Sequence, residues 1–531
     1  MKTVFRSFLV FLSFSLAQES ISYDISNQFG YQIKNNLIQW NNDQEFENIL
    51  VDRSSKNFTN KFHSFNFNEF PADSIYTKSK FIYEFGDYGF DALNIGLKKN
   101  NEMNSFQFFA GKKSFFGNYS EFSDEDGSPL SLFYKFDFSV KVKNHSVYTS
   151  AGYFREKSNF RFNNPFGLDS SNNKEFSDFI SLKVGDAFKI NDNHYNIELN
   201  HISKFDSINI AEYNLNNRND LKRNLLNMEV HNGRWLHLKA VIDNNYYMNE
   251  ISSKGFSTNL ISLSNKNNFS VGDITYGVDF LEDEISPKIL INNSFGIFNI
   301  SVQSINKPNR VLNDLFSYQV IDEFSGRKLE NWNSVNIGLN IDKKVSISSH
   351  INFTQANDIA ISQKPLEMSV VEDDIYLNIN DNITSLETSI SFPIKFGQFD
   401  ITHYYNFYDS AISSNRTHSL NLEYLYNLSL VSNKLGIEGK IGLQYFSEND
   451  SDYYFDYFRD IPVKGKNYVL DDFYNLYLKM DVSISDVILT IRLKNGLYKF
   501  FEEDDYSPVN HELFNPVSSL LSFGIIWEFD D

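Results

Sequence analysis

The feature that most restricts the fold of this chain is a set of long runs in which apolar and polar residues strictly alternate. In Leu130–Val140 the even positions carry Leu, Tyr, Phe and Val, whereas Lys135 and Asp137 lie on the opposite face. A β-strand sends successive side chains to opposite faces, so this pattern predicts strands with one apolar and one polar face. The same alternation recurs in Thr417–Leu428, Phe473–Ile484 and Val487–Tyr498.

The length of these runs distinguishes a membrane barrel from a soluble β-sandwich. Strands of globular proteins average about 5–6 residues, whereas a tilted strand that crosses a bilayer needs about 9–11. The runs in this chain are about 9–12 residues long. No segment offers the roughly 18 consecutive apolar residues of a transmembrane helix. Because only helices and closed barrels satisfy their backbone hydrogen bonds in lipid, we predict an all-β, antiparallel, up-and-down transmembrane barrel.

Short connections alternate with long ones along the chain. Short turns are expected at Asn232-Gly233, Asp342-Lys343 and Ser485-Asp486. Long loops are expected near 113–129, 155–176, 203–223, 305–331, 355–382, 447–472 and 499–517. Outer-membrane barrels have this rhythm, with short periplasmic turns and long extracellular loops. Counting hairpins predicts roughly 22 strands, within a range of about 18–24, and a barrel that spans residues 75–529.

The N-terminus has the pattern of a secretory signal peptide. Met1–Arg6 carries two positive charges, Phe8–Leu16 is a short apolar stretch, and Ser15-Leu16-Ala17 is a small-x-small cleavage site. We therefore expect residues 1–17 to be removed on export. Residues 18–74 are less regular, and they predict either two further strands or a short periplasmic or luminal extension. This segment is too short for the globular plug of a TonB-dependent transporter.

Composition and motifs exclude several kinds of function. The chain has no Cys, so disulfides and cysteine catalysis are impossible. Its net charge of −20 argues against binding to nucleic acid. No catalytic motif is present, and we assign no catalytic residue and no cofactor. The acidic loop Asp124-Glu125-Asp126 could ligate Ca²⁺, but a solvated loop is the simpler interpretation, and we predict no metal site.

Charged residues on the polar faces of the strands are the candidate functional residues. A Lys or Arg that faced lipid at mid-membrane would cost about 2–4 kcal/mol, so these side chains are expected to face a polar interior. There they would line a pore and set its selectivity, or form ion pairs inside a plugged lumen. Because both signs occur, we expect weak selectivity from the wall and a modest cation preference from the acidic loops. The predicted lining residues are Lys135, Asp137, Glu387, Glu423, Lys479, Asp481, Arg492 and Lys494.

Aromatic residues on the apolar faces are candidates for the girdles that mark the two membrane interfaces. Plain contact with lipid tails is the alternative role. The girdle candidates are Tyr134, Tyr424, Tyr426 and Tyr474.

The last strand resembles the β-signal of outer-membrane proteins. The segment from Ser522 to Phe529 places a polar residue, a glycine and two aromatics at Ser522, Gly524, Trp527 and Phe529, followed by Asp530. The resemblance implies recognition of this strand by the barrel assembly machinery through strand addition. Over most of its length the chain resembles porin-like, plug-less outer-membrane barrels of Gram-negative-type bacteria. The partners implied are outer-membrane lipids, the assembly machinery and a small solute.

Three functions follow from this sequence. We expect an outer-membrane porin-like channel for passive diffusion of small hydrophilic solutes. The first alternative is a non-conducting receptor or scaffold barrel that binds a partner or ligand. The second is an outer-membrane barrel hydrolase. The oligomeric state is open, with a homo-oligomer as one alternative.

Overall fold

The computed structural model of this chain describes its β-structure from residue 76 onward. The described residues are 76–101, 103–114, 130–160, 173–210, 215–232, 236–249, 253–269, 272–281, 284–308, 329–362, 376–407, 418–430, 435–448, 453–456, 461–464, 472–494, 496–499 and 519–530. The predicted signal peptide, residues 18–74, the acidic loop at Asp124 and the loop 499–517, apart from Lys499, therefore lie outside the described residues.

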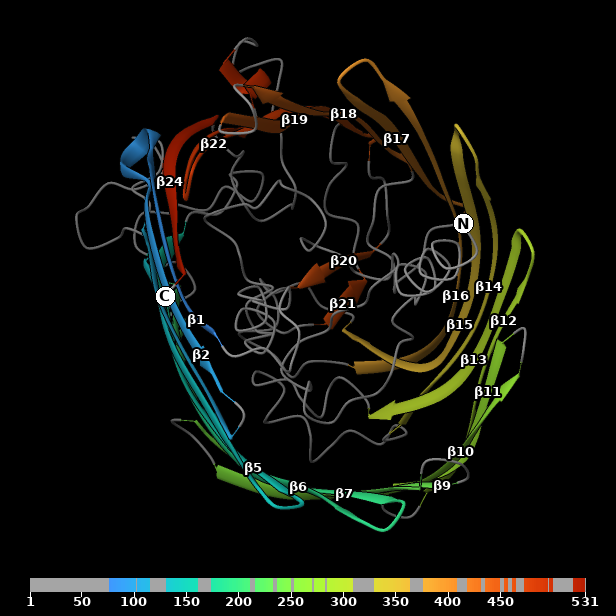
Figure 1. The fold of residues 1–531 in the computed structure, drawn as a ribbon. Helices are drawn as coiled ribbons and strands as arrows, with labels where there is room; N and C mark the ends of the chain where they lie inside the picture. Colours follow the sequence, from blue (N-terminus) through green and yellow to red (C-terminus); the bar gives the residue numbers. More distant parts are fainter. Residues whose placement is uncertain are drawn as a thin grey trace.

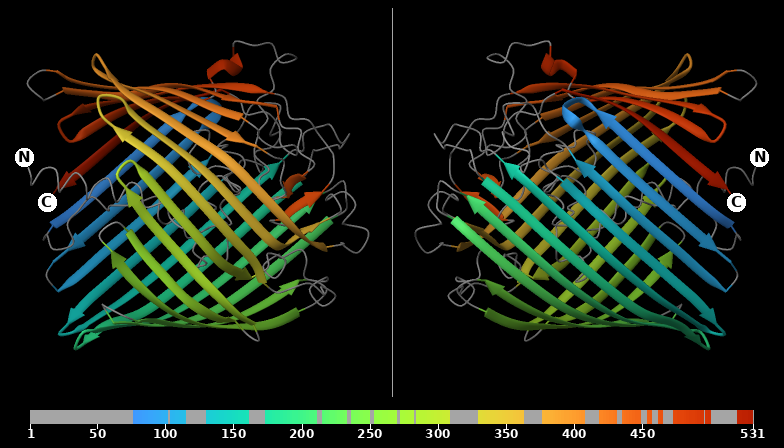
Figure 2. Two further views of the ribbon diagram at one scale, coloured as in Figure 1. Left: turned by 90° about the vertical axis from the view of Figure 1, so that its right-hand side faces the viewer. Right: turned by 90° about the vertical axis from the view of Figure 1, so that its left-hand side faces the viewer.

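The strands form one antiparallel sheet that closes on itself as a 22-stranded barrel (Figures 1 and 2). The wall strands are β1 (Tyr76–Gly86), β2 (Asp91–Asn100), β3 (Asn104–Ser114), β4 (Leu130–Val142), β5 (His145–Phe160), β6 (Asn173–Ile190), β7 (Asn193–Ile210), β8 (Leu215–Asn232), β9 (Leu236–Asn249), β10 (Ser253–Phe269), β11 (Gly272–Leu281), β12 (Glu284–Phe295), β13 (Phe298–Pro308), β14 (Leu329–Asp342), β15 (Ser346–Ser362), β16 (Tyr376–Ile394), β17 (Gly397–Asn406), β18 (His418–Leu430), β19 (Leu435–Phe446), β22 (Phe473–Ile484), β23 (Val487–Lys494) and β24 (Leu520–Asp530). Two short 3-10 helices, η3 (Asp87–Gly89) and η8 (Gly496–Lys499), follow β1 and β23.

Each wall strand pairs with its neighbours in the chain, and the last strand returns to the first. β24 pairs with β1 over the register from Lys78↔Asp530 to Gly86↔Ser522. The barrel thus closes with strands from residue 76 onward, which confirms the predicted fold and strand number. A closed barrel leaves no sheet edge with unpaired backbone groups.

The turns at one end of the barrel are tight. Lys143, Asn191, Phe396 and Ser485 all have positive φ angles between 54° and 66°, as two-residue hairpin turns require. The other end carries the long connections, such as 115–129 between β3 and β4 and 309–328 between β13 and β14. The predicted rhythm of short turns and long loops is therefore present.

The loop predicted at 203–223 is wrong. β7 and β8 are each 18 residues long and pair without interruption up to Ile210↔Leu215. The outer half of this hairpin is rich in Asn, Ser, Lys and Arg, which resembles a loop in composition. Backbone pairing does not need an apolar face, so at about 3.3 Å per residue the two strands extend well past the membrane.

A second departure concerns the predicted loop 447–472. It contains a short hairpin of β20 (Tyr453–Asp456) and β21 (Ile461–Lys464). β21 does not join the wall in sequence order but pairs in parallel with the outer end of β15 at Ser362↔Val463. Seen down the barrel axis, this hairpin lies within the outline of the wall (Figure 1).

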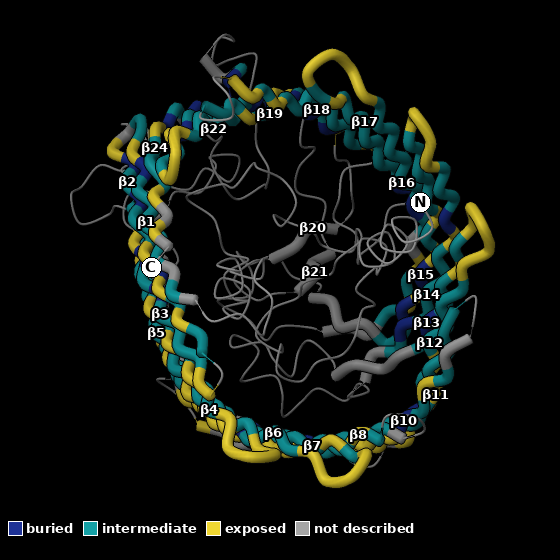
Figure 3. The backbone as a smooth tube through the Cα atoms, viewed as in Figure 1, coloured by how far each residue is buried: buried dark blue, intermediate teal, exposed yellow. Residues whose placement is uncertain are grey.

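Apolar side chains cover the outside of the barrel. On β6, Ile180, Leu182 and Val184 are 51%, 48% and 48% exposed, and Leu199 on β7 is 59% exposed. The exposure pattern alternates along the wall strands (Figure 3). Such a surface is unstable in water and suits lipid tails, so the alternation read from the sequence corresponds to a lipid-facing and an inner face.

Among the described residues, no helix has the length and apolar character needed to span a membrane.

Candidate functional site: the inner wall

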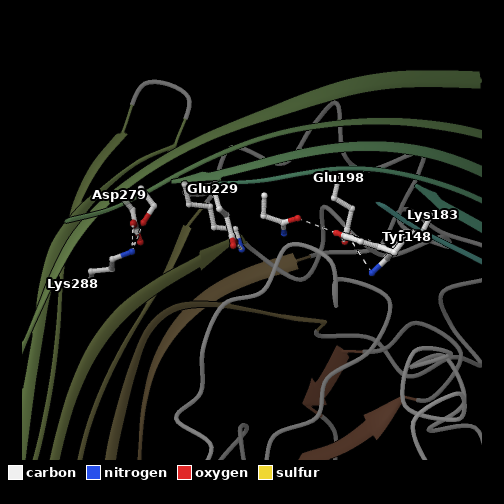
Figure 4. A network of polar contacts seen from close by, with 9 residues as sticks. Tyr148, Lys183, Glu198, Glu229, Asp279 and Lys288 are labelled. Atoms are coloured by element: carbon white, nitrogen blue, oxygen red, sulfur yellow. Dashed lines mark hydrogen bonds and ion pairs between the residues drawn. The ribbon is translucent and has the colours of Figure 1, made fainter. Parts of the chain in front are cut away.

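The polar faces of the strands line the interior of the barrel. Figure 4 shows side chains that point from the wall inward, among them Tyr148, Lys183, Glu198, Asp279 and Lys288. The paired registers then place every second residue of each neighbouring strand on the same face. This inner wall is the candidate functional surface.

Ion pairs link neighbouring positions on the inner wall of β4 to β12. Lys183 Nζ lies 3.3 Å from Glu198 Oε1, and Lys239 Nζ lies 3.3 Å from Glu229 Oε1. Lys288 Nζ lies 2.7 Å from Asp279 Oδ1 and also bonds the Ser262 hydroxyl. Each pair joins two adjacent strands, so the charges neutralise one another within the wall. We call the inner faces of β4–β12 the charged arc.

A tyrosine that lies over a glycine organises the charged arc. The Tyr148 hydroxyl on β5 lies 2.9 Å from Glu198 Oε2 and 3.0 Å from Asn196 Oδ1, both on β7. To reach them its ring crosses β6 above Gly185, where a Cβ atom would come within 2.3 Å of the ring. Lys183, two residues before that glycine, binds the same Glu198 carboxylate. Three strands are thereby held in one register.

The same arrangement recurs elsewhere in the barrel with other residues. The Tyr477 hydroxyl on β22 lies 2.9 Å from Glu423 Oε2 and 3.1 Å from Asn421 Oδ1 on β18. Its ring covers Gly442 on β19, where a Cβ would meet it at 2.2 Å, and Lys440 Nζ lies 3.5 Å from Glu423. In both copies a Lys-x-Gly strand separates a tyrosine from an Asn-x-Glu strand. We call each copy a tyrosine bridge.

The inner wall of β13–β17 is different, because hydroxyl and amide side chains dominate its middle. Among the described residues, four carboxylates, those of Asp342, Asp381, Glu387 and Asp400, and the imidazole of His350 interrupt this set. We call the set the uncharged arc: Asn299, Ser301, Gln303, Ser334, Asn336, Ser348, Asn352, Thr354, Ser385, Ser389, Thr402 and Asn406. Several of its members are almost fully buried, including Thr354 at 3% and Ser385 at 1% exposed.

The predicted lining residues whose side chains are described lie on this inner face, and most of them have an ion-pair partner. Lys135 lies 3.1 Å from Asp137, and Lys479 lies 3.0 Å from Asp481. Glu423 belongs to the second tyrosine bridge. Two further residues, Glu387 and Arg492, are paired in register with Tyr404 and Ser522. The backbone of Lys494 pairs with Leu520, but its side chain lies outside the described part. Whether these residues line a conducting path stays a prediction.

The predicted β-signal residues divide between the two faces of β24. Trp527 and Phe529 point outward, 44% and 38% exposed, with ring centroids 4.5 Å apart. Ser522 points inward and is 2% exposed, and its hydroxyl donates to Glu84. Gly524 lies on the same face, next to Thr490. Recognition by the assembly machinery stays a prediction.

The girdle candidates all lie on the outer face. Tyr134 stacks on Tyr153 at 6.2 Å, and Tyr474 lies 5.0 Å from Tyr445 near the long-loop end. Tyr424 and Tyr426 lie 6.1 Å apart near the tight turn at residues 395–396. These positions are those that two girdles require, and their contact with the membrane interfaces stays a prediction.

Sequence reasoning missed the partners that neutralise the wall. Glu84, Lys183, Glu198, Lys288 and Lys440 were not singled out, although each occupies a polar position in an alternating run. The repeated Lys-x-Gly and Asn-x-Glu patterns were visible signals, but only the strand register shows that they meet. Among the described residues no group of three or more His, Asp or Glu side chains is placed to hold a metal ion.

Comparison with known proteins finds solved structures that share the fold of this barrel. No family model matches the sequence, and no curated protein matches it either. Solved structures that resemble this barrel include the pyoverdine outer membrane receptor FpvA of Pseudomonas aeruginosa, at a TM-score of 0.63 and 10% identity. The FrpB iron transporter of Neisseria meningitidis has a TM-score of 0.63 and 8% identity. The ferric enterobactin receptor PfeA of Pseudomonas aeruginosa has a TM-score of 0.59 and 12% identity. Each match covers 86% of this chain and 79%, 83% and 81% of the respective structure.

At these identities the likeness is one of fold. The closed wall, its apolar exterior and its polar interior define an outer-membrane β-barrel of the Gram-negative type. The predicted fold class and the outer-membrane location are thereby confirmed.

Proposed function

We propose that this barrel is a selective, receptor-type transporter for a small ligand and not a general diffusion porin. The observation that carries the proposal is the β20–β21 hairpin, which leaves the wall after β19 and pairs with β15 at Ser362↔Val463. It is therefore anchored within the outline of the barrel at the end with the long connections (Figures 1 and 2). A segment fixed there narrows the entrance and offers a surface to a ligand.

The size of the barrel supports the same conclusion. Porins with 16–18 strands leave an aqueous channel, whereas 22-stranded outer-membrane transporters have a filled lumen. Trp332, Thr354 and Ala356 face inward, yet they are only 2%, 3% and 0% exposed. Inner-wall side chains of a wide water-filled channel would be wet. The similar structures carry names of receptors and transporters for iron and ferric chelates, so a metal chelate is a reasonable ligand class to test first.

We infer that the ligand contacts the half-exposed members of the uncharged arc, and neither its buried members nor the charged arc. In the charged arc, lysines and carboxylates bind one another, which lowers their capacity for new partners. Hydroxyls and amides such as Ser389 and Asn336 offer donors and acceptors without a net charge. This chemistry suits a polar ligand of low net charge.

Recording in planar bilayers tests the proposal. The wild-type barrel is expected to give no long-lived conductance steps, and a variant in which a Gly-Ser linker replaces residues 449–471 is expected to conduct. A barrel in which the linker replaces residues 115–129, another long connection, is the matched control and should stay closed. Large, stable steps from the wild-type protein would establish the passive porin instead.

Ligand binding is measured separately. A neutral ferric trihydroxamate chelate and the trianionic ferric enterobactin serve as probes, and quenching of tryptophan fluorescence reports binding to the detergent-solubilised barrel; the uncharged arc predicts that the neutral chelate binds more tightly. Saturable quenching that is lost in the 449–471 variant supports a receptor. If neither chelate nor a panel of small neutral solutes binds, and the wild type conducts, the receptor assignment fails.

A further inference from the structure

The seam between β1 and β24, where the barrel closes, carries a buried polar cluster. The Ser522 hydroxyl donates to Glu84 Oε1 at 2.5 Å, and Arg492 Nη1 donates to Glu84 Oε2 at 3.1 Å. Glu84 comes from β1, Ser522 from β24 and Arg492 from β23. One carboxylate of the first strand therefore binds side chains of the last two strands.

Burial makes these contacts important. Glu84 is 8% exposed and Ser522 is 2% exposed, so water has little access to either group. A carboxylate taken out of water is stable only when it is paired and hydrogen-bonded. Loss of either partner would leave part of the Glu84 charge uncompensated at the place where the two ends of the sheet meet.

Glycines at the seam allow the strands and the cluster to come this close. A Cβ on Gly86 would lie 2.6 Å from the Leu521 carbonyl oxygen, and Gly86 is paired with Ser522. A Cβ on Gly524 would lie 2.6 Å from Thr490 Cγ2, beside the Glu84 side chain. Small residues are therefore needed at both positions for packing reasons.

A second contact holds the same end of the seam. Asp87, the first residue of η3, accepts the backbone N–H of Leu521 through Oδ2 at 3.2 Å. Leu521 immediately precedes Ser522, and Asp87 lies three residues after Glu84. Two carboxylates of the first hairpin thus hold the beginning of the last strand.

We propose that Glu84, Arg492 and Ser522 form a closure latch that fixes the first strand to the last strand when the barrel completes folding. Ser522 and Gly524, which the sequence pattern assigns to the assembly signal, then have a second role in the finished barrel. During assembly the last strand exchanges its partner for β1, and Glu84 binds the Ser522 hydroxyl at that step. Arg492 is a positioning residue for Glu84 and not a selectivity residue. The latch does not depend on the transport proposal.

Disulfide trapping tests the latch, because the natural chain has no Cys to interfere. Tyr83 and Ile525 are paired across the seam, and Leu199 and Leu226 are paired within the wall between β7 and β8. Paired residues of antiparallel strands have Cα separations that suit a disulfide. Cysteines at either pair therefore report whether that part of the sheet is closed.

If the latch exists, its substitution lowers disulfide yield at the seam only. Glu84→Gln and Ser522→Ala should each lower disulfide yield at Tyr83→Cys/Ile525→Cys by about threefold or more during refolding, with Glu84→Gln the stronger. Yield at Leu199→Cys/Leu226→Cys should not change. Glu229→Gln, which removes an inward carboxylate paired with Lys239 far from the seam, is the matched control: it should leave the seam yield unchanged, and any loss it causes should fall on the Leu199→Cys/Leu226→Cys pair beside it.

Three outcomes would overturn the latch. In the first, seam yield is unchanged in both Glu84→Gln and Ser522→Ala. In the second, the two cysteine pairs lose yield equally, because the effect is then a general loss of folding. In the third, Glu84→Gln does not fold and a seam disulfide formed by oxidation fails to restore the heat-modifiable band on a denaturing gel, which would place the role of Glu84 away from closure.

Discussion

The charged arc and the uncharged arc belong to the same sheet, yet they use their inner faces differently. On β4–β12, charges such as Lys183 and Glu198 are bound to one another across strands. On β13–β17, the corresponding middle positions carry groups such as Ser389 and Thr402, whose hydroxyls lie 3.2 Å apart. In the charged arc, the polar side chains bind one another and hold the strands in register. The uncharged arc retains neutral groups that are suited to contact with a ligand.

The difference also shows how a wide barrel keeps its shape. Strands on both arcs have the same backbone pairing, so stability specific to the charged arc comes from side chains that span two or three strands. The tyrosine bridges do this most fully, since Tyr148 reaches from β5 across β6 to β7. Substitutions in the charged arc should therefore affect folding, and those in the uncharged arc should affect it little.

The largest effect is expected where a glycine lies under a bridge tyrosine. Gly185→Val places side-chain atoms where the Tyr148 ring lies, because even a Cβ would come within 2.3 Å of it. Overpacking of this kind, together with the loss of the bridge, should lower the free energy of unfolding by about 2–3 kcal/mol. The urea concentration at which half of the heat-modifiable band is lost measures this change in unfolding free energy. Gly442→Val under Tyr477 should behave alike.

Gly296 provides the control for this substitution. It lies in the β12–β13 turn with φ of 63° and has nothing within 4 Å of an added Cβ. Gly296→Val should therefore show only the backbone cost of a side chain at positive φ, about 1 kcal/mol. If Gly296→Val is as harmful as Gly185→Val, the tyrosine bridge has no special role.

The bridges also show how far the sequence could be read. Strong alternation around Tyr134 and Leu422 was enough to predict the closed barrel, its strand number and its two faces. Lys135 could be given an inner position in the same way. The partners of Glu423 could not be found, because Lys440 and Tyr477 come from other strands, and their meeting depends on register.

The errors have physical causes of the same kind. The sequence of the β7–β8 hairpin predicts a loop because its outer half has no apolar face, although backbone pairing extends to Ile210 and Leu215. β20 and β21 are only 4 residues long, and their pairing with β15 is a long-range contact that no local pattern encodes. Local sequence therefore predicts the membrane-spanning wall well and the parts beyond the membrane poorly.

A smaller effect is expected from removing one charge of the charged arc. Glu198→Gln leaves Lys183 without its carboxylate and weakens the bond to Tyr148, in a place where the Glu198 side chain is 12% exposed. Removal of one partner costs less for an exposed ion pair than for a fully buried one, and this pair is intermediate. The expected loss of unfolding free energy is therefore about 1–2 kcal/mol. Exchange of the two residues, Lys183→Glu with Glu198→Lys, should recover part of the lost unfolding free energy. No recovery, with a loss as large as that of Gly185→Val, would mean that the bridge geometry matters and the charge pair does not.

Removal of a hydroxyl from the uncharged arc should cost less. Ser389→Ala removes one half of a 3.2 Å contact with Thr402 between two neutral groups on adjacent strands. The expected change in unfolding free energy is about 0.5 kcal/mol, measured by the same urea titration. The ligand assay should respond more strongly than the titration, because this arc is the proposed contact surface. A stability loss equal to that of Glu198→Gln would remove the distinction between the arcs.

The smallest effect concerns ion selectivity, measured as a reversal potential in the conducting variant that lacks residues 449–471. Lys479 lies 3.0 Å from Asp481, so the pair contributes little field beyond its immediate surroundings. Lys479→Gln leaves one uncompensated carboxylate on the wall, and salt screens it over about 10 Å at 0.1 M, less than the half-width of so large a barrel. The potential should therefore shift slightly toward cations, whereas the double variant with Asp481→Asn should match the parent. A large shift in the single variant would show that Lys479 borders a narrow conducting path, and the wall would then determine selectivity.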